Sequence, residues 1–149
     1  MTISKQTASD AGPDRARVLE ALAEEFRTQE EVEWVEECGA SPESRAAIFA
    51  GRCQDVSRRL AAFLLSRGQA ALRVGGYYRD IPESYFAERG AAYEDGCWKH
   101  WWVESDGLII DVTADQFHVD EEDSYRVVVT GCDDPSYRKI VAGEISLPA

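Results

Sequence analysis

The chain has 149 residues, of which 44% are hydrophobic and 30% charged, and these values are typical of a single globular domain. Its formal net charge of -12, without a cluster of Lys and Arg, excludes nucleic acid as an expected partner because the phosphate backbone would be repelled. No apolar stretch reaches membrane-spanning length, and the polar N-terminus lacks the features of a signal peptide. We therefore expect a cytoplasmic location and no membrane partner.

Four cysteines occur in a chain without a secretory signal, and this usage indicates reduced thiols rather than a disulfide framework. They are Cys38, Cys53, Cys97 and Cys132. The thiols are therefore available for chemistry or for metal binding.

The N-terminal part predicts a flexible tail and then a helix. Residues 1–12 are polar, and Pro13 suits the first turn of a helix. Apolar residues then recur with helical spacing as far as Cys38, in one helix or two. Five glutamates form the expected solvated face of this region, with a basic partner as the alternative interpretation. They are Glu30, Glu31, Glu33, Glu36 and Glu37.

Two further helices are predicted before the pattern changes. Ser41 and Pro42 are typical of a helix start and predict a short helix through Phe49. A second helix opens at Cys53 and ends near Gly68, with its apolar stripe formed by Val56, Leu60, Phe63 and Leu64.

The second half of the chain has the composition of strands. β-Branched and aromatic residues are concentrated in residues 71–78, 98–105, 108–113 and 125–130. Helices followed by strands predict the α+β class, with N-terminal helices packed on an antiparallel β-sheet in one domain over residues 13–149.

The segment His100 to Thr113 predicts a hairpin whose register has a chemical consequence. Asp106-Gly107 is a typical two-residue turn, which places Ser105 opposite Leu108. Side chains alternate between faces, so His100 and Asp111 then share one face as diagonal neighbours, ~7 to 8 Å apart at the backbone. An imidazole can reach a carboxylate across that gap, and the carboxylate would then fix the tautomer of the imidazole.

Cys53 is the expected nucleophile for this pair. It opens a helix, where the helix dipole and free N–H groups favour a thiolate and can bind an oxyanion. The other three cysteines lack such a setting. The sequence therefore predicts a catalytic triad of Cys53, His100 and Asp111.

Three segments together resemble the transglutaminase-like and papain-like cysteine hydrolases: GRCQDVSRRLAAFLLSRG, VGGYY and KHWWVESDGLIIDVTADQF. The resemblance implies a small catalytic domain of that fold, thiol acyl transfer without a cofactor, and a peptide, protein or small amide as substrate. It places the nucleophile, base and orienting acid at Cys53, His100 and Asp111. The chain departs from the animal transglutaminases in having Gln54 after the cysteine, and Val112 replaces the proline of their frequent D-P-T sequence.

Substrate-binding candidates lie around this triad. They are Trp98, Trp102, Tyr77 and Gln116, whereas Trp101 alternates away from His100 and is expected in the core. Two alternatives remain. Cys97 and His100 could form half of a zinc site, although alternation sends them to opposite faces. The fold could also be a non-catalytic module whose aromatic groove grips a peptide, with a vestigial triad.

Overall fold

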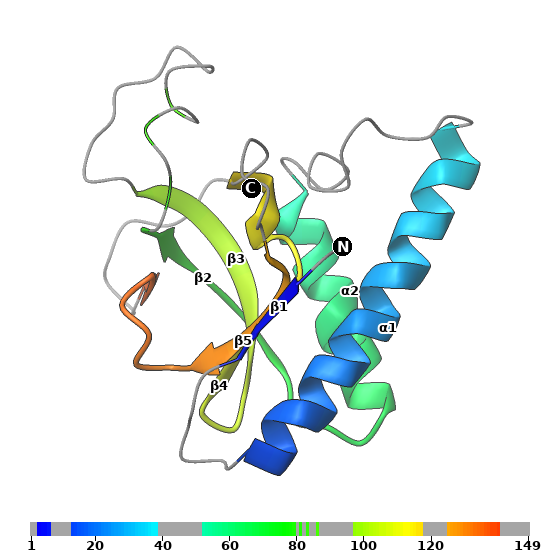
Figure 1. Ribbon diagram of the computed structural model, residues 1–149, viewed down its shortest axis with the longest axis horizontal. Helices are drawn as coiled ribbons and strands as arrows, with labels where there is room; N and C mark the ends of the chain where they lie inside the picture. Colours follow the sequence, from blue (N-terminus) through cyan, green and yellow to red (C-terminus); the bar gives the residue numbers. More distant parts are fainter. Residues whose placement is uncertain are drawn as a thin grey trace.

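The computed structural model describes residues 3–6, 13–38, 52–79, 97–117 and 125–140, together with positions 81, 83 and 86. Two helices in these ranges, α1 (Pro13–Cys38) and α2 (Cys53–Ser66), accompany a six-stranded sheet (Figure 1). The strands are β1 (Ile3–Gln6), β2 (Leu72–Tyr78), β3 (Trp98–Ser105), β4 (Leu108–Asp111), β5 (Tyr125–Gly131) and β6 (Tyr137–Lys139). A short 3-10 helix, η2 (Ala114–Phe117), follows β4. The predicted α+β class is confirmed.

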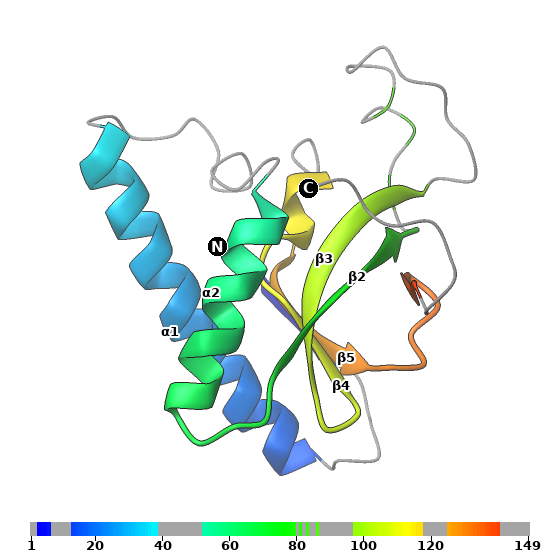
Figure 2. The same cartoon turned by 180° about the vertical axis from the view of Figure 1, so that it is seen from behind.

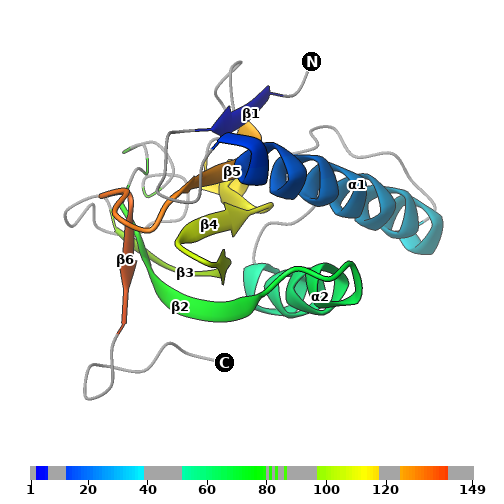
Figure 3. The ribbon, with the colours of Figure 1, turned by 90° about the horizontal axis from the view of Figure 1, so that it is seen from below.

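The strands follow the order β1-β5-β4-β3-β2-β6 in a curled sheet (Figure 3). All neighbours are antiparallel except β1, which runs parallel to β5. β3 and β4, the strands of the predicted hairpin, lie at the centre of this order, with β5 on one side and β2 on the other. A side chain on β3 or β4 is therefore surrounded by other strands.

Both helices cover the same face of the sheet (Figures 1 and 2). α1 packs against β4 and β5, and α2 packs against β2 and β3. Their apolar stripes form one core with the helix-facing residues of the sheet, including Leu19, Phe26, Val56, Leu60, Leu64, Val103, Ile110 and Val127. Burial of this stripe explains why α2 forms where the 3.6-residue spacing predicts it.

A second core lies on the opposite face of the sheet and is rich in aromatic residues. It contains Val74, Tyr78, Ile81, Phe86, Trp102, Ile109, Ala114, Phe117, Val128 and Tyr137. The curled sheet thus buries side chains on both of its faces, and residues that alternate away from the helices are also enclosed.

The local signals for the hairpin and for the end of α2 are confirmed. Ser105 pairs with Leu108. Between them, Asp106 and Gly107 have φ angles of 44° and 87°, and a two-residue type I′ turn requires positive φ at both positions. Gly68, with φ 77°, ends α2, and the N–H of Gln69 donates to the carbonyl of Leu64 at 3.0 Å.

The structure differs from prediction in two places before α2. Ile3–Gln6 was expected in a flexible tail but forms β1, because its backbone pairs with the edge of β5. Glu30 and Glu31 were expected on a solvated face but are 8% and 9% exposed, since each meets an arginine. The short helix predicted from Ser41 to Phe49 lies outside the described residues.

Within the described ranges, no helix combines the length and the apolar composition needed to cross a membrane.

Candidate active site

His100 and Asp111 meet at the point where β3 and β4 separate. The pairing of these strands runs from the turn to Val103 and Ile110. Beyond it the two strands are linked through side chains, because the Nε2–H of His100 donates to Oδ2 of Asp111 at 2.7 Å. Both side chains are buried, at 0% and 1% exposure. The shared face predicted from the hairpin register is therefore present.

Every oxygen of the Asp111 carboxylate accepts hydrogen bonds. The Thr113 N–H donates to Oδ1 at 3.0 Å, and the Thr113 hydroxyl donates to the same oxygen at 3.3 Å. The Tyr137 hydroxyl donates to Oδ2 at 2.9 Å. Tyr137 comes from β6, a three-residue strand that the sequence analysis did not predict. The carboxylate is thus fixed in one orientation toward His100.

Cys53 approaches the same imidazole from the start of α2. Its half-buried thiol interacts with His100 and receives the backbone N–H of Trp101. Asp111 occupies Nε2, and the other ring nitrogen, Nδ1, is buried and makes no hydrogen bond of ordinary length and angle. The contact between Cys53 and the imidazole is therefore looser than an ordinary hydrogen bond, as is common in active sites without substrate. The structure therefore brings Cys53, His100 and Asp111 together.

The electrostatics of the three groups favour a charged pair. Burial alone would raise the pKa of Cys53, but the polar contact with His100, the charge of that ring and the Trp101 N–H lower it below its ordinary value of 9.0. Burial would likewise lower the pKa of His100, but the charge of Asp111 and its hydrogen bond raise this pKa to about 10. The pKa of Asp111 is held below its ordinary value because His100, Thr113 and Tyr137 outweigh the effect of burial. These shifts favour a thiolate beside an imidazolium over a neutral thiol beside a neutral imidazole.

Aromatic rings enclose the imidazole on the face away from the helices. Tyr78, Phe117 and Trp102 have ring centroids 5.8, 5.0 and 6.2 Å from that of His100. Gly76 pairs with His100 across β2 and β3, and a Cβ at this position would overlap the Trp102 ring and the carbonyl of Arg138. The glycine therefore allows the indole to lie beside the histidine.

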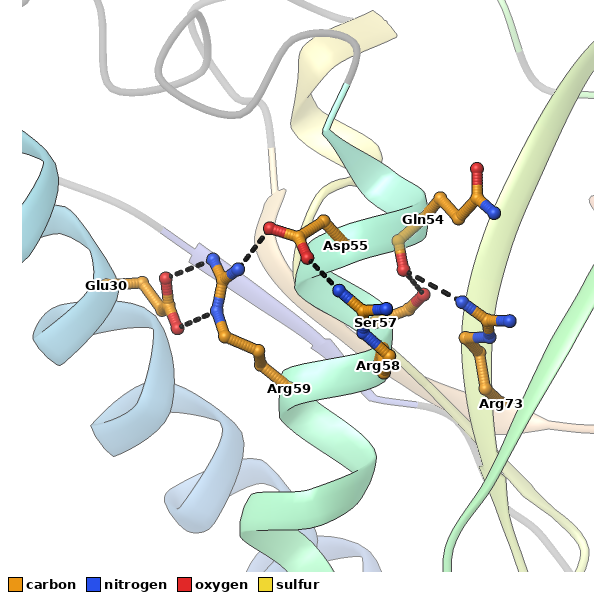
Figure 4. Close-up of polar contacts among 7 residues, drawn as sticks. All are labelled: Glu30, Gln54, Asp55, Ser57, Arg58, Arg59 and Arg73. Atoms are coloured by element: carbon orange, nitrogen blue, oxygen red, sulfur yellow. Dashed lines mark hydrogen bonds and ion pairs between the residues drawn. The ribbon is translucent and has the colours of Figure 1, made fainter. Parts of the chain in front are cut away.

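Ion pairs attach the first turns of α2 to α1 (Figure 4). Arg59 donates to both carboxylate oxygens of Glu30, at 2.8 and 2.7 Å, and also pairs with Asp55. Arg58 reaches the other oxygen of Asp55 at 2.6 Å. Asp55 lies two residues after Cys53, so these contacts hold the turn that carries the thiol.

A buried arginine attaches the segment after Asp111 to the same helix. Arg27 is 0% exposed and donates to both oxygens of Asp115, at 3.0 Å each. It also donates to the carbonyl of Val112 and, at 2.9 Å, to Glu31. α1 therefore contacts both the helix that begins at Cys53 and the segment that follows Asp111.

The predicted roles of the two central tryptophans were wrong. Trp102 is 1% exposed and belongs to the second core, so it does not line an open cleft. Trp101 is half-buried, with the guanidinium of Arg73 4.5 Å above its ring. Alternation predicted which residues share the histidine face, but the curled sheet encloses that face.

Of the other substrate-binding candidates, Tyr77 lies away from the imidazole. Tyr77 pairs with Lys99, so it lies on the face opposite His100, and its neighbour Tyr78 contacts the histidine instead. Trp98 is 37% exposed and contacts Phe86 at 5.5 Å. Gln116 lies in η2, and its side chain is outside the described part.

No group of three or more metal-ligating side chains that could hold an ion is found among the residues the structure describes. In comparisons with known proteins, no family model, no curated protein and no solved structure matches this chain.

Proposed function

We propose that this protein is a thiol-dependent acyl-transfer enzyme of the transglutaminase-like and papain-like kind. The observation that carries the proposal is the position of His100, whose ring lies between the Cys53 thiol and the Asp111 carboxylate. Neither contact alone would suggest catalysis, because structural histidines often bind carboxylates. A buried imidazole held by a carboxylate and coupled to a half-exposed thiol at a helix start is the arrangement that thiol acyl transfer uses.

In the first half-reaction, the Cys53 thiolate attacks the carbonyl carbon of an amide, a C–S bond forms, and the carbonyl oxygen takes the negative charge. The N-terminal amides of α2 have no intrahelical acceptors and are suited to bind this oxyanion. As the C–N bond breaks, the imidazolium of His100 gives its proton to the departing amine. The products are a thioester on Cys53 and a free amine.

In the second half-reaction, water or an amine attacks the thioester and loses a proton to the neutral His100. The C–S bond breaks and the Cys53 thiolate returns. Asp111 accepts a hydrogen bond from His100 throughout and stabilises the imidazolium. With water the enzyme acts as a protease, amidase or deamidase, and with an amine it acts as a transamidase.

The proposal is tested by the pH dependence of Cys53 alkylation with iodoacetamide, followed by mass spectrometry of the peptide that contains Cys53. We expect wild-type Cys53 to react below pH 9, whereas in His100→Ala the pKa of the thiol should rise because burial and the charge of Asp111 are then opposed only by the Trp101 N–H. Cys132, which is exposed and far from the imidazole in sequence, is the internal control and should titrate identically in both proteins.

A second measurement tests acyl transfer itself. p-Nitrophenyl acetate should release one equivalent of p-nitrophenolate in a burst and leave a hydroxylamine-sensitive acetyl group on Cys53. Cys53→Ser should abolish the burst. If the Cys53 profile is that of an ordinary thiol and no acyl group forms, the three residues are not a catalytic unit, and a peptide-binding module replaces this proposal.

A further inference from the structure

One face of β2, β3 and β6 beside Cys53 carries basic and aromatic side chains. Tyr77 pairs with Lys99 on one side and with Arg138 on the other, so alternation places all three on the face that α2 covers further along. Trp101 shares this face because it lies two residues beyond Lys99. Lys99 and Arg138 are exposed, and Tyr77 and Trp101 are half-buried.

One end of this face lies beside Cys53. The backbone N–H of Trp101 interacts with the Cys53 thiol. Arg73, which covers the Trp101 ring, donates from Nη1 to the carbonyl of Gln54 at 3.3 Å, and Figure 4 shows it reaching the first turn of α2. Lys99 is two residues from Trp101, so its position lies ~7 Å further along the strand.

The charge of this face is opposite to that of the whole chain, which carries 28 acidic and 16 basic residues. On the described parts of β2, β3 and β6, alternation gives this face the cations Arg73, Lys99 and Arg138 and no carboxylate. The acid of β3, Glu104, alternates to the other face, where it pairs with Lys139 at 3.2 Å. A basic face on an acidic protein, next to a nucleophile, is complementary to an anionic ligand.

We propose that this face binds the acyl donor, and that the preferred donor carries a carboxylate close to the scissile carbonyl, as an acidic peptide does. The proposal rests on the proposed function and names its substrate class. The aromatic rings of Tyr77 and Trp101 offer contact area for the donor chain, while Lys99 and Arg138 attract its carboxylate.

The test compares two alkylating probes at Cys53, anionic iodoacetate and neutral iodoacetamide, at low ionic strength. The ratio of their rate constants is the quantity of interest, because the fraction of thiolate affects both rates equally. One charge ~10 Å away in water changes such a ratio about twofold, so we expect Lys99→Gln/Arg138→Gln to lower it about fourfold. Raising the salt to 1 M should remove most of the wild-type preference.

Lys139→Gln is the control for the Arg138 half of this variant, since it removes one positive charge from the neighbouring position of β6, on the opposite face and paired with Glu104, and its ratio should equal that of wild type. An unchanged ratio in the double variant, or an equal fall in Lys139→Gln, overturns the proposal. The same variants are then acylated with p-nitrophenyl hydrogen glutarate and p-nitrophenyl butyrate, and the wild type should favour the anionic ester more than the double variant does.

Failure of this proposal is distinguishable from failure of the proposed function. The thiolate is tested by the pH profile of the wild type with iodoacetamide alone, a probe without charge. A low thiol pKa together with an unaltered probe ratio contradicts the proposal of an acidic donor but agrees with the proposed acyl-transfer activity. An ordinary thiol pKa contradicts both proposals.

Discussion

The two ends of the candidate triad are held in different ways. Asp111 is 1% exposed and accepts hydrogen bonds from His100, Thr113 and Tyr137, so its position is set deep in the sheet. Cys53 is half-buried, and its helix turn is attached through ion pairs of Asp55 and Arg59 that are partly open to solvent. Buried contacts of the first kind contribute strongly to stability, whereas exposed ion pairs of the second kind contribute little.

This difference indicates that the two ends of the site have different roles. Asp111 and His100 are held rigidly, because moving either side chain would leave a buried polar group without a partner. The thiol is only partly buried, and it lies on a helix turn with weaker attachments. Substitutions at the buried end should therefore change the free energy of unfolding first, and substitutions at the exposed end should change thiol chemistry first.

The largest expected effect concerns the two central tryptophans. Trp102→Ala should lower the free energy of unfolding by ~3 to 5 kcal/mol, the usual cost of truncating a buried aromatic residue. Trp101→Ala should cost clearly less because its ring is half-exposed under Arg73. Urea unfolding of both variants measures the difference. Equal losses would contradict the burial contrast seen here.

Arg27→Met should be the next most damaging change. Removal of one partner from a buried ion pair costs roughly 3 to 5 kcal/mol, since Asp115 would remain buried without its cation. Burial already raises the pKa of Asp115 to about 6 despite the charge of Arg27, so the carboxyl is more readily neutralised at pH 5 than at pH 8. The loss should therefore be smaller at pH 5. Urea unfolding at both pH values measures it, and Arg27→Met/Asp115→Asn should recover part of the loss.

Asp111→Asn should have an intermediate effect, because it keeps the shape of the side chain and removes its charge. We expect a loss of about 1.5 to 3 kcal/mol, the value of a hydrogen bond to a charged group, together with a partial rise of the Cys53 pKa. Urea unfolding and the iodoacetamide profile measure the two effects. A Cys53 profile identical to wild type would separate Asp111 from the site.

The pH dependence of the free energy of unfolding follows from the pKa shifts of Asp111 and His100. The lowered pKa of Asp111 gives stabilisation that is present above its ordinary value of 3.8 and lost as the pH falls below it. The raised pKa of His100 gives stabilisation that is complete below 6.5 and lost as the pH rises through about 10. The difference between wild type and Asp111→Asn should therefore be largest between pH 3.8 and 6.5.

The local parts of the site were predictable from sequence, and the long-range parts were not. The Asp106-Gly107 turn and strand alternation were sufficient to place His100 and Asp111 on one face, because both are short-range rules. Tyr137 was missed, since a three-residue strand has no usable period. The partner of Glu30, Arg59, also comes from a distant segment, so the expected solvated face was partly buried.

The burial of Trp102 shows a second limit. Alternation specifies a face but does not say whether that face is open, because the answer depends on how the whole sheet curls. Here the aromatic residues of β2, β6 and η2 close over it. Periodicity of a single strand carries no information about such closure.

The smallest expected effect is at the exposed end, where Arg58→Gln should lower the free energy of unfolding by no more than about 1 kcal/mol, as is usual for a pair open to solvent. Its effect on Cys53 should be more evident. Without Arg58, the negative charge of Asp55 is less neutralised two residues from the thiol, and the pKa of Cys53 should rise slightly. Arg67→Gln, which breaks an exposed pair with Glu25 at the far end of α2, is the matched control and should leave the iodoacetamide profile of Cys53 as in wild type. If Arg58→Gln instead costs as much stability as Arg27→Met while the Cys53 profile stays fixed, the thiol end is as rigidly anchored as the acid end, and the contrast between the two fails.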